Sequence, residues 1–228
     1  MPDAGIAEAI ASETALPIAG VRAVLALFED GGTVPFIARY RKETTGGLDE
    51  VAIMDIRDRS AALVELGKRR TAIMASCEEQ DVLSEALKKS LAGARTMAEL
   101  EDLYLPYKPK RRTRAMMAKE RGLDGLAVYI MKQKNSGAPL WDVAVKYVSE
   151  ENGVESVDDA IAGARDIIAE SASEHAPTRG RMRRLYARST VIYASESKKA
   201  QGDAGKYRDY YGTETSVRGA PSHRILAL

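Results

Sequence analysis

The sequence predicts an all-α protein, a multi-helix bundle around one long central helix with a helix-turn-helix-like module at its N-terminal end. Three observations predict this fold class. Apolar residues recur at steps of three or four along most of the chain, which is the helical period. One such run, from Asp49 to Glu78, contains no proline, and the only strand signal is the tyrosine-rich segment Lys206–Tyr211. The 228 residues are 45% hydrophobic and 29% charged, so we expect one compact unit with a sizeable core.

Shorter helices precede and follow the long one, separated by glycines, prolines and Asn135. We expect residues 1–50 to form the helix-turn-helix-like module and residues 51–228 the helical core. The expected shorter helices are 6–14, 18–29, 34–42, 82–91, 97–104, 123–132, 140–150, 156–174 and 178–194. The expected loops are 43–47, 106–113, 135–139, 151–155 and 197–205.

The long helix carries the clearest periodic stripe. About 30 residues at 1.5 Å each give a helix of roughly 45 Å, on which the shorter helices can dock. Gly67 is its only weak point. The expected buried positions are Ile53, Ile56, Ser60, Leu63, Leu66, Arg70, Met74 and Cys77.

Two further helices have recognisable ends. Ser156 and Asp159 have the spacing of a capping box, which predicts a helix start there. His175 to Pro177 end that helix, and the next begins near Thr178. The expected inward residues are Val157, Ile161, Ala164, Ile168 and Ala172 on the first helix, and Met182, Leu185, Tyr186 and Ser189 on the second.

The segment 18–42 has the pattern of a helix-turn-helix. Asp30-Gly31-Gly32 breaks the first helix, and Thr33 is a suitable N-cap for the second. The second helix of such a module can enter a DNA groove. A plain packed helix pair is the commoner explanation of such a pattern, and Arg39 and Arg41 would then pair with acids on neighbouring helices. The apolar anchors are Phe36, Ile37 and Tyr40, and the cations are Arg39, Arg41 and Lys42.

A proline-stiffened basic loop is a second candidate site. The loop can neutralise several phosphates, and Tyr104 and Tyr107 can stack on bases. Alternatively it is a tether with buried tyrosines and solvated cations. Its cations are Lys108, Lys110, Arg111, Arg112 and Arg114.

The helix expected at 178–194 carries a third set of cations, Arg181, Arg184 and Arg188, at steps of three and four. They form one stripe, which suits phosphate contacts. The alternative is a salt-bridged face against the acidic segment 142–174.

Charge is segregated along the chain although the net charge is only +1. Segments 104–121 and 179–199 each hold seven basic residues and one acidic residue, for a net charge of +6. Segment 142–174 holds nine acids and two bases, for a net charge of −7. The blocks either close on one another or leave basic faces open to a polyanion.

Composition also bounds the location and chemistry. No apolar run approaches the ~20 residues of a membrane helix, and the acidic first residues do not resemble a secretory signal. A single cysteine, Cys77, excludes an internal disulfide and indicates a reducing compartment. We therefore expect a cytoplasmic protein without membrane attachment.

Enzymatic and cofactor patterns are missing from the sequence. Two histidines and one cysteine do not provide a usual zinc site, and no phosphate-binding glycine loop or nucleophile elbow is present. Ser222-His223 are sequence neighbours, which is no sign of a catalytic triad. We expect no enzymatic activity, no metal and no cofactor.

Three sequence blocks are distinctive. They are GTVPFIARYRKE at 32–43 continued by TGGLDE at 45–50, then LEDLYLPYKPKRRT at 100–113, and PSHRILAL at 221–228. Together they resemble the Tex family of bacterial transcription accessory proteins. They follow the family's order and span nearly the whole chain. The resemblance implies a cytoplasmic nucleic-acid-binding factor related to a eukaryotic transcription elongation factor.

The same resemblance implies a longer parent protein. In the family, the helical N-terminal region precedes an RNase-H-like domain, a helix-hairpin-helix pair and an OB-fold. This sequence stops inside the third block, so we expect an N-terminal fragment or truncated product that lacks the OB-fold.

Two functions compete. The first is a non-enzymatic RNA- or DNA-binding region that contacts mainly phosphates. The second is a helical scaffold that docks on RNA polymerase, ribosome-associated machinery or the missing domains. Residues expected to contact nucleic acid are Arg39, Arg41, Lys42, Tyr107, Lys108, Lys110, Arg111, Arg112, Arg114, Arg181, Arg184 and Arg188.

Overall fold

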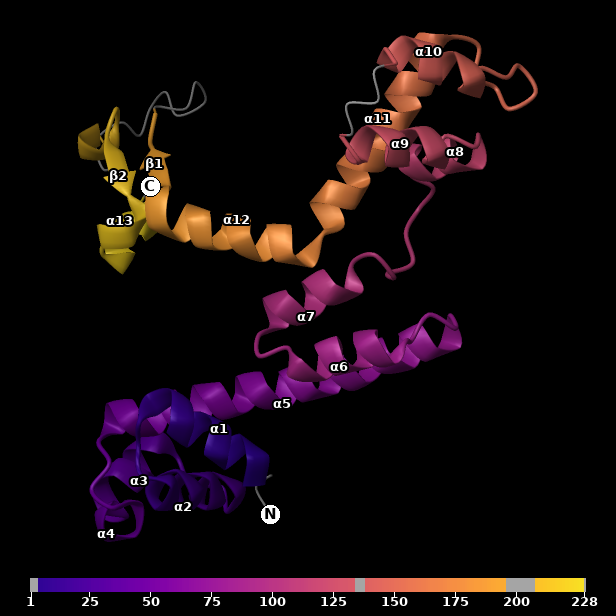
Figure 1. The fold of residues 1–228 in the computed structure, drawn as a ribbon. Helices are drawn as coiled ribbons and strands as arrows, with labels where there is room; N and C mark the ends of the chain where they lie inside the picture. Colours follow the sequence, from indigo (N-terminus) through magenta and orange to yellow (C-terminus); the bar gives the residue numbers. More distant parts are fainter. Residues whose placement is uncertain (1–3, 134–137, 196–207, 228) are drawn as a thin grey trace. The chain divides into compact units, whose positions relative to one another are not determined.

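The structure, a computed structural model, describes residues 4–133, 138–195 and 208–227. It is mostly helical, with one small sheet in the described ranges, which confirms the predicted fold class (Figure 1). The chain divides into two compact units, one up to Leu100 and one from Glu101 onward. The expectation of a single compact unit is therefore wrong, because each unit has a hydrophobic core of its own.

The first unit is organised by the long helix α5, Glu50–Glu79. Its start follows from a local signal, because the Asp49 carboxylate accepts a hydrogen bond from the Ala52 backbone N–H at 2.8 Å. The other helices of this unit are α1 (Ala4–Thr14), α2 (Ile18–Glu29), α3 (Val34–Tyr40), α4 (Lys42–Thr45) and α6 (Glu85–Gly93), followed by α7 (Met97–Tyr104), which spans the boundary between the units.

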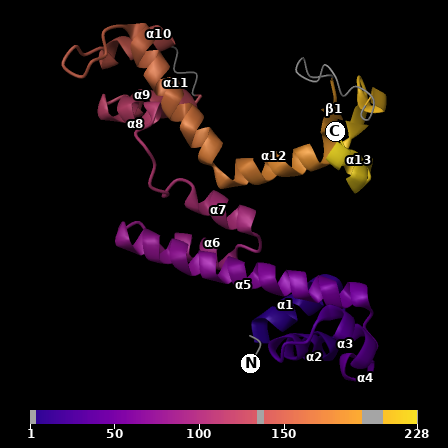
Figure 2. The ribbon, with the colours of Figure 1, turned by 180° about the vertical axis from the view of Figure 1, so that it is seen from behind.

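Both halves of α5 bury one stripe. The N-terminal half packs against α1, α2 and α3 through Ile53 and Ile56, which are fully buried. The C-terminal half contacts α6, as both views show (Figures 1 and 2). There Arg70 donates to the carbonyl oxygens of Leu91 at 3.0 Å and Ala94 at 2.8 Å. The predicted stripe is thus largely confirmed, with Ile73 buried rather than its neighbour Met74.

The second unit is built around α11, Val157–Glu174. The Ser156 hydroxyl accepts from the Asp159 backbone N–H at 3.1 Å, which confirms the predicted N-cap. The remaining helices and strands are α8 (Arg114–Glu120), α9 (Asp124–Met131), α10 (Leu140–Ala144), η1 (Val145–Tyr147), α12 (Ala176–Ser189), β1 (Val191–Tyr193), η2 (Arg208–Tyr210), β2 (Glu214–Ser216), η3 (Val217–Gly219) and α13 (Ser222–Ala227).

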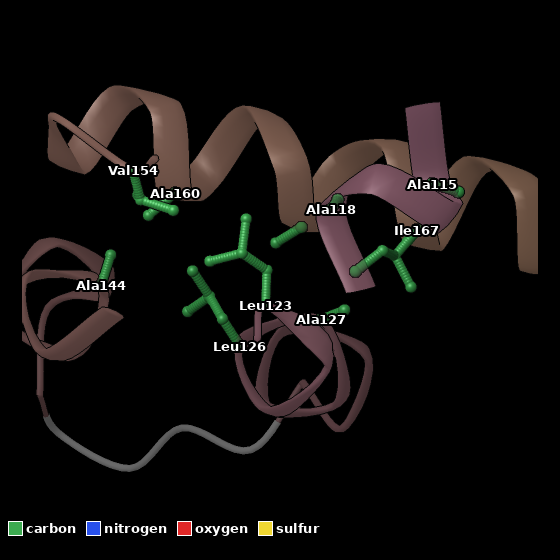
Figure 3. Close-up of a cluster of buried hydrophobic side chains, with 10 residues drawn as sticks. Ala115, Ala118, Leu123, Leu126, Ala127, Ala144, Val154, Ala160 and Ile167 are labelled. Atoms are coloured by element: carbon green, nitrogen blue, oxygen red, sulfur yellow. The ribbon is translucent and has the colours of Figure 1, made fainter. Parts of the chain in front are cut away.

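The second core lies where α8, α9 and α10 pack on α11 (Figure 3). Small residues of α11 face Leu123 and Leu126, which point into the cluster. Gly163 allows the closest approach, because a Cβ built on it would lie 2.3 Å from Leu123 Cδ1. The buried positions on α11 are Ala160, Ala164 and Ile167. Of the predicted inward residues, Ala164 is buried, Val157, Ile161 and Ile168 are half-buried and pack against this core, and Ala172 is exposed.

Several local predictions were wrong. The basic segment after Thr113 was not expected to be helical but forms α8, and the expected loop 43–47 begins as α4. Helix 140–150 ends early, as α10 and one 3-10 turn. Helix 178–194 ends at Ser189 because β1 follows and pairs antiparallel with β2. The described part of the expected strand Lys206–Tyr211 is a 3-10 turn at 208–210, and Lys206 and Tyr207 lie outside the described residues, as do 135–137 and 197–205 of the expected loops.

Candidate nucleic-acid interface

The turn between α2 and α3 has the geometry of a tight helix-turn-helix connection. Gly31 adopts a positive φ of 81°, a conformation that suits glycine. The Gly32 N–H donates to the Leu27 carbonyl at 2.8 Å. Thr33 is extended at the N-cap, but its side chain makes no capping hydrogen bond. The turn therefore places α3 as the sequence predicts, with backbone bonds in place of the side-chain cap.

The apolar anchors expected on α3 are mostly exposed. Ile37 is fully buried, whereas Phe36 and Tyr40 are 41% and 61% exposed. The two rings contact each other with centroids 5.5 Å apart, and the Arg41 guanidinium carbon lies 5.1 Å from the Phe36 centroid. The prediction that both rings anchor the helix is wrong, because only the Ile37 side of this short helix faces the core.

The cations beside α3 are open to solvent. Arg39, Arg41 and Lys42 are exposed, and none has a carboxylate partner among the described residues. The ion pairs that a plain packed helix pair would use are thus missing from this part of the chain. Within the described residues, Arg41 contacts the Phe36 ring and donates one long hydrogen bond, at 3.4 Å, from Nη1 to the Tyr40 carbonyl.

The basic loop before α8 is partly neutralised by the acidic helix α11. Lys110 forms an ion pair with Glu174, and both side chains are largely buried at 23% and 17% exposure. Arg114 Nε lies 3.9 Å from Asp166 Oδ1. The segregated charges of the sequence therefore close on one another at two points of this unit.

The rest of the loop differs from residue to residue. Arg112 pairs with Glu120, while Lys108 and Arg111 are exposed and have no carboxylate partner within the described ranges. Tyr104 is buried at 5% exposure, so it is not available for stacking on a base. Tyr107 is half-buried.

Helix α12 carries its arginines on two sides. At about 100° per residue, Arg181, Arg184 and Arg188 fall within about 60° of one another, and Arg179 and Arg183 lie on the opposite side. The first three are exposed and have no carboxylate partner among the described residues. The predicted alternative, salt bridges to segment 142–174, is not seen for them.

The opposite side of α12 is held by a buried carboxylate. Arg179 Nε donates to Asp102 Oδ1 at 2.7 Å, and Arg183 pairs with Asp102 Oδ2. Burial by itself raises the pKa of Asp102, but the hydrogen bonds and charges of Arg183 and Arg179 outweigh burial and hold that pKa below its ordinary value. No sequence pattern indicated this contact, since 77 residues separate Asp102 from Arg179.

The expected inward face of α12 is solvent-exposed. Met182, Leu185, Tyr186 and Ser189 are all exposed, and α12 has no buried residue. The helix follows α11 after His175 (Figure 2) and contacts η3. The prediction of an inward apolar face was wrong because the ion pairs of Arg179 and Arg183 with Asp102, rather than apolar packing, position this helix.

Family comparisons agree with the sequence blocks. Residues 4–78 match the model of the Tex-like protein N-terminal domain, and residues 137–228 match the Tex central region-like model. The chain belongs to the Tex family. Protein tex of Bordetella pertussis is 40% identical over 222 residues, covering 96% of this chain and 27% of the relative.

Other Tex relatives have the same coverage pattern. Transcriptional accessory protein Tex of Neisseria gonorrhoeae is 37% identical over 98% of this chain and 29% of its own length. The human S1 RNA-binding domain-containing protein 1 is 26% identical over 90% of this chain and 21% of its own length. The present Tex-like chain therefore spans less than a third of these relatives.

Other kinds of site have no support in the described part of this Tex-like chain. No group of His, Cys, Asp and Glu side chains within it is arranged to hold a metal ion. No helix described here combines the length and apolarity needed to cross a membrane. The candidate interface therefore rests on the exposed cations of α12 and of the α3–α4 segment.

Proposed function

We propose that this Tex-like chain is a non-enzymatic nucleic-acid-binding region of a transcription accessory factor, which holds RNA or DNA mainly through phosphate contacts. One observation carries the proposal. Two groups of cations, one at α3–α4 and one on α12, are exposed and have no carboxylate partner among the described residues. When such groups bind a phosphate backbone, they displace the counterions condensed on it, and the release of these counterions drives binding.

The ion pairs on one side of α12 support phosphate binding by the other side. Because Asp102 fixes Arg179 and Arg183, the opposite side of the helix presents its three free guanidinium groups in one stripe. A stripe of this kind follows a backbone without reading bases, so recognition is expected to be weakly sequence-specific. The names of the relatives, which include a transcriptional accessory protein and an S1 RNA-binding protein, are consistent with this function.

A salt titration tests the proposal. The full chain is titrated with a fluorescein-labelled single strand and a matched duplex, and the logarithm of affinity is plotted against the logarithm of salt concentration. Replacement of Arg181, Arg184 and Arg188 by alanine should reduce the slope by about 2 for the single strand. The matched control, the triple alanine variant of Arg22, Arg57 and Lys68, removes the same charge from exposed cations already paired with carboxylates.

Equal slopes for the two triple variants would contradict the proposal, and so would undetectable binding at low salt. A second function is favoured by a different observation, the exposed Met182, Leu185 and Tyr186 on α12. They suit a scaffold that docks on RNA polymerase or ribosome-associated machinery. Capture of polymerase subunits that survives nuclease treatment and is lost in Leu185→Ser would support that alternative.

A further inference from the structure

An open groove lies between the end of α2 and the exposed side of α3. Its volume is about 440 Å³, within the ~300–1,000 Å³ range of sites for small molecules and bases. One wall is the end of α2 and the turn, and the other is α3 with the residue that follows it. The lining residues are Leu27, Asp30, Gly31, Gly32, Thr33, Phe36 and Arg41.

The groove is lined by an exposed aromatic ring with a guanidinium group beside it. Phe36 is 41% exposed although its neighbour Ile37 is buried, and the Arg41 guanidinium lies over the Phe36 ring at 5.1 Å. Tyr40 does not line the groove but contacts Phe36, with its ring tilted 45° to that of Phe36. Aromatic rings and guanidinium planes are the groups on which proteins stack unpaired bases.

Polar groups and charge surround this surface in a pattern that suits a nucleotide. Thr33 is exposed and its hydroxyl makes no capping bond, so together with the Asp30 carboxylate it can meet the polar edge of a base. Arg39 and Lys42 are exposed nearby in the sequence and carry charges for the flanking phosphates. An apolar peptide would need none of these cations.

The same geometry argues against α3 as a duplex-reading helix. Pro35, Phe36, Arg39 and Tyr40 are its exposed residues, so bulky rings and a proline occupy the side that would meet base edges. Of these residues only Arg39 and the Tyr40 hydroxyl can form hydrogen bonds with base edges, which are the main contacts of major-groove readout. Rings meet bases by stacking, which requires that the bases be unpaired.

We propose that the α2–α3 groove holds one unstacked nucleobase of a single strand, stacked against Phe36 and Arg41. This inference rests on the proposed function, because the flanking cations hold the strand that delivers the base. It adds a base-stacking subsite to a chain whose other candidate contacts are with phosphates.

The test compares two strands of equal length, a fluorescein-labelled oligoadenylate and an abasic strand with the same phosphates. Phe36→Ala should weaken oligoadenylate binding by about 5- to 150-fold, the range expected for one base–aromatic contact. It should leave the salt slope and the affinity for the abasic strand unchanged. Phe36→Trp should retain the affinity, and Phe36→Leu, which keeps apolar bulk without a ring, should not.

Controls separate this inference from the proposed function. Tyr193→Ala removes an aromatic side chain on β1 that is more exposed than Phe36, at 62% against 41%, and should not change either affinity. Equal oligoadenylate binding by Phe36→Ala and the unmodified chain overturns the stacking subsite alone, as does an equal loss on both strands. Absence of salt-dependent binding to either strand overturns the proposed function and the subsite together. A circular dichroism melt confirms that each variant is folded.

Discussion

The ion pair between Asp102 and the two arginines of α12 leads to a direct stability prediction. Asp102→Asn keeps the shape of the side chain and removes its charge. The amide can accept from one guanidinium but presents N–H groups to the other, so one charge-assisted hydrogen bond is lost and the second is weakened. Because apolar packing contributes little to α12, this change should lower the free energy of unfolding of the second unit.

The expected magnitude follows from burial. A hydrogen bond to a charged group contributes about 1.5–3 kcal/mol. Asp102 is buried, but the side chains of Arg179 and Arg183 are 41% and 43% exposed, and solvent screening reduces their contribution. We expect Asp102→Asn to lower the free energy of unfolding by about 2 kcal/mol. With a slope of about 2 kcal/mol/M, the urea midpoint would fall by about 1 M.

The pH dependence has a definite sign. The folded pKa of Asp102 lies below its ordinary value of 3.8, so the folded state binds this proton less tightly than the unfolded state. The stabilisation is complete above the unfolded pKa and is lost as pH falls through the depressed folded pKa. The difference in stability between the unmodified chain and Asp102→Asn should therefore be constant above about pH 5 and shrink below about pH 4.

The assay is urea unfolding followed by the fluorescence of Trp141, the only tryptophan of the chain, which lies in the second unit. Glu120→Gln is the matched control, because it removes one carboxylate charge from an exposed pair in the same unit. It should leave the midpoint unchanged. A midpoint for Asp102→Asn equal to that of Glu120→Gln would refute the reasoning.

Three further predictions concern glycines, a cap and the cysteine. Gly163→Ala should lower the free energy of unfolding by about 1–3 kcal/mol, because its methyl would lie 2.3 Å from Leu123 Cδ1. Gly67→Ala has open space around it and should raise the free energy of unfolding by about 0.5–1 kcal/mol. Shifts of the urea midpoint in opposite directions check this pair. Arg70→Gln removes the guanidinium donors to the carbonyl oxygens of Leu91 and Ala94 at the end of α6. The free energy of unfolding should fall by about 2 kcal/mol, and the amides of α6 should exchange faster. Unchanged amide exchange would argue against the contact. Burial raises the pKa of the Cys77 thiol, so a thiol reagent should label it slowly in the native chain and rapidly in urea, while fast native labelling would show that α5 opens there.

Local signals in the sequence were sufficient for parts of the fold. The periodic stripe predicted α5 nearly to the residue, and the capping-box spacing of Ser156 and Asp159 predicted the start of α11. These signals are read within a few residues, so no tertiary information is needed. The same holds for the glycine turn before α3.

Predictions that depended on distant contacts were less successful. The exposed state of Phe36 and Tyr40 depends on which side of α3 meets α5, and the burial of Tyr104 depends on its packing neighbours. The ion pair between Asp102 and Arg179 joins residues far apart in the chain. Lys110 was expected to be free, although Glu174 pairs with it. Charge blocks in the sequence reveal that partners exist, but only the fold decides which cations they neutralise.

The two-sided arrangement of arginines on α12 has an evolutionary consequence. Arg179 and Arg183 are tied to one carboxylate, so substitutions there should be tolerated only together with a compensating change at position 102. Under the proposed function, positions 181, 184 and 188 contact phosphates instead, and lysine can replace arginine there without disturbing the fold. The proposal therefore predicts two independent kinds of selection on one short helix, which pairwise variation among relatives would reveal as coupling on one side only.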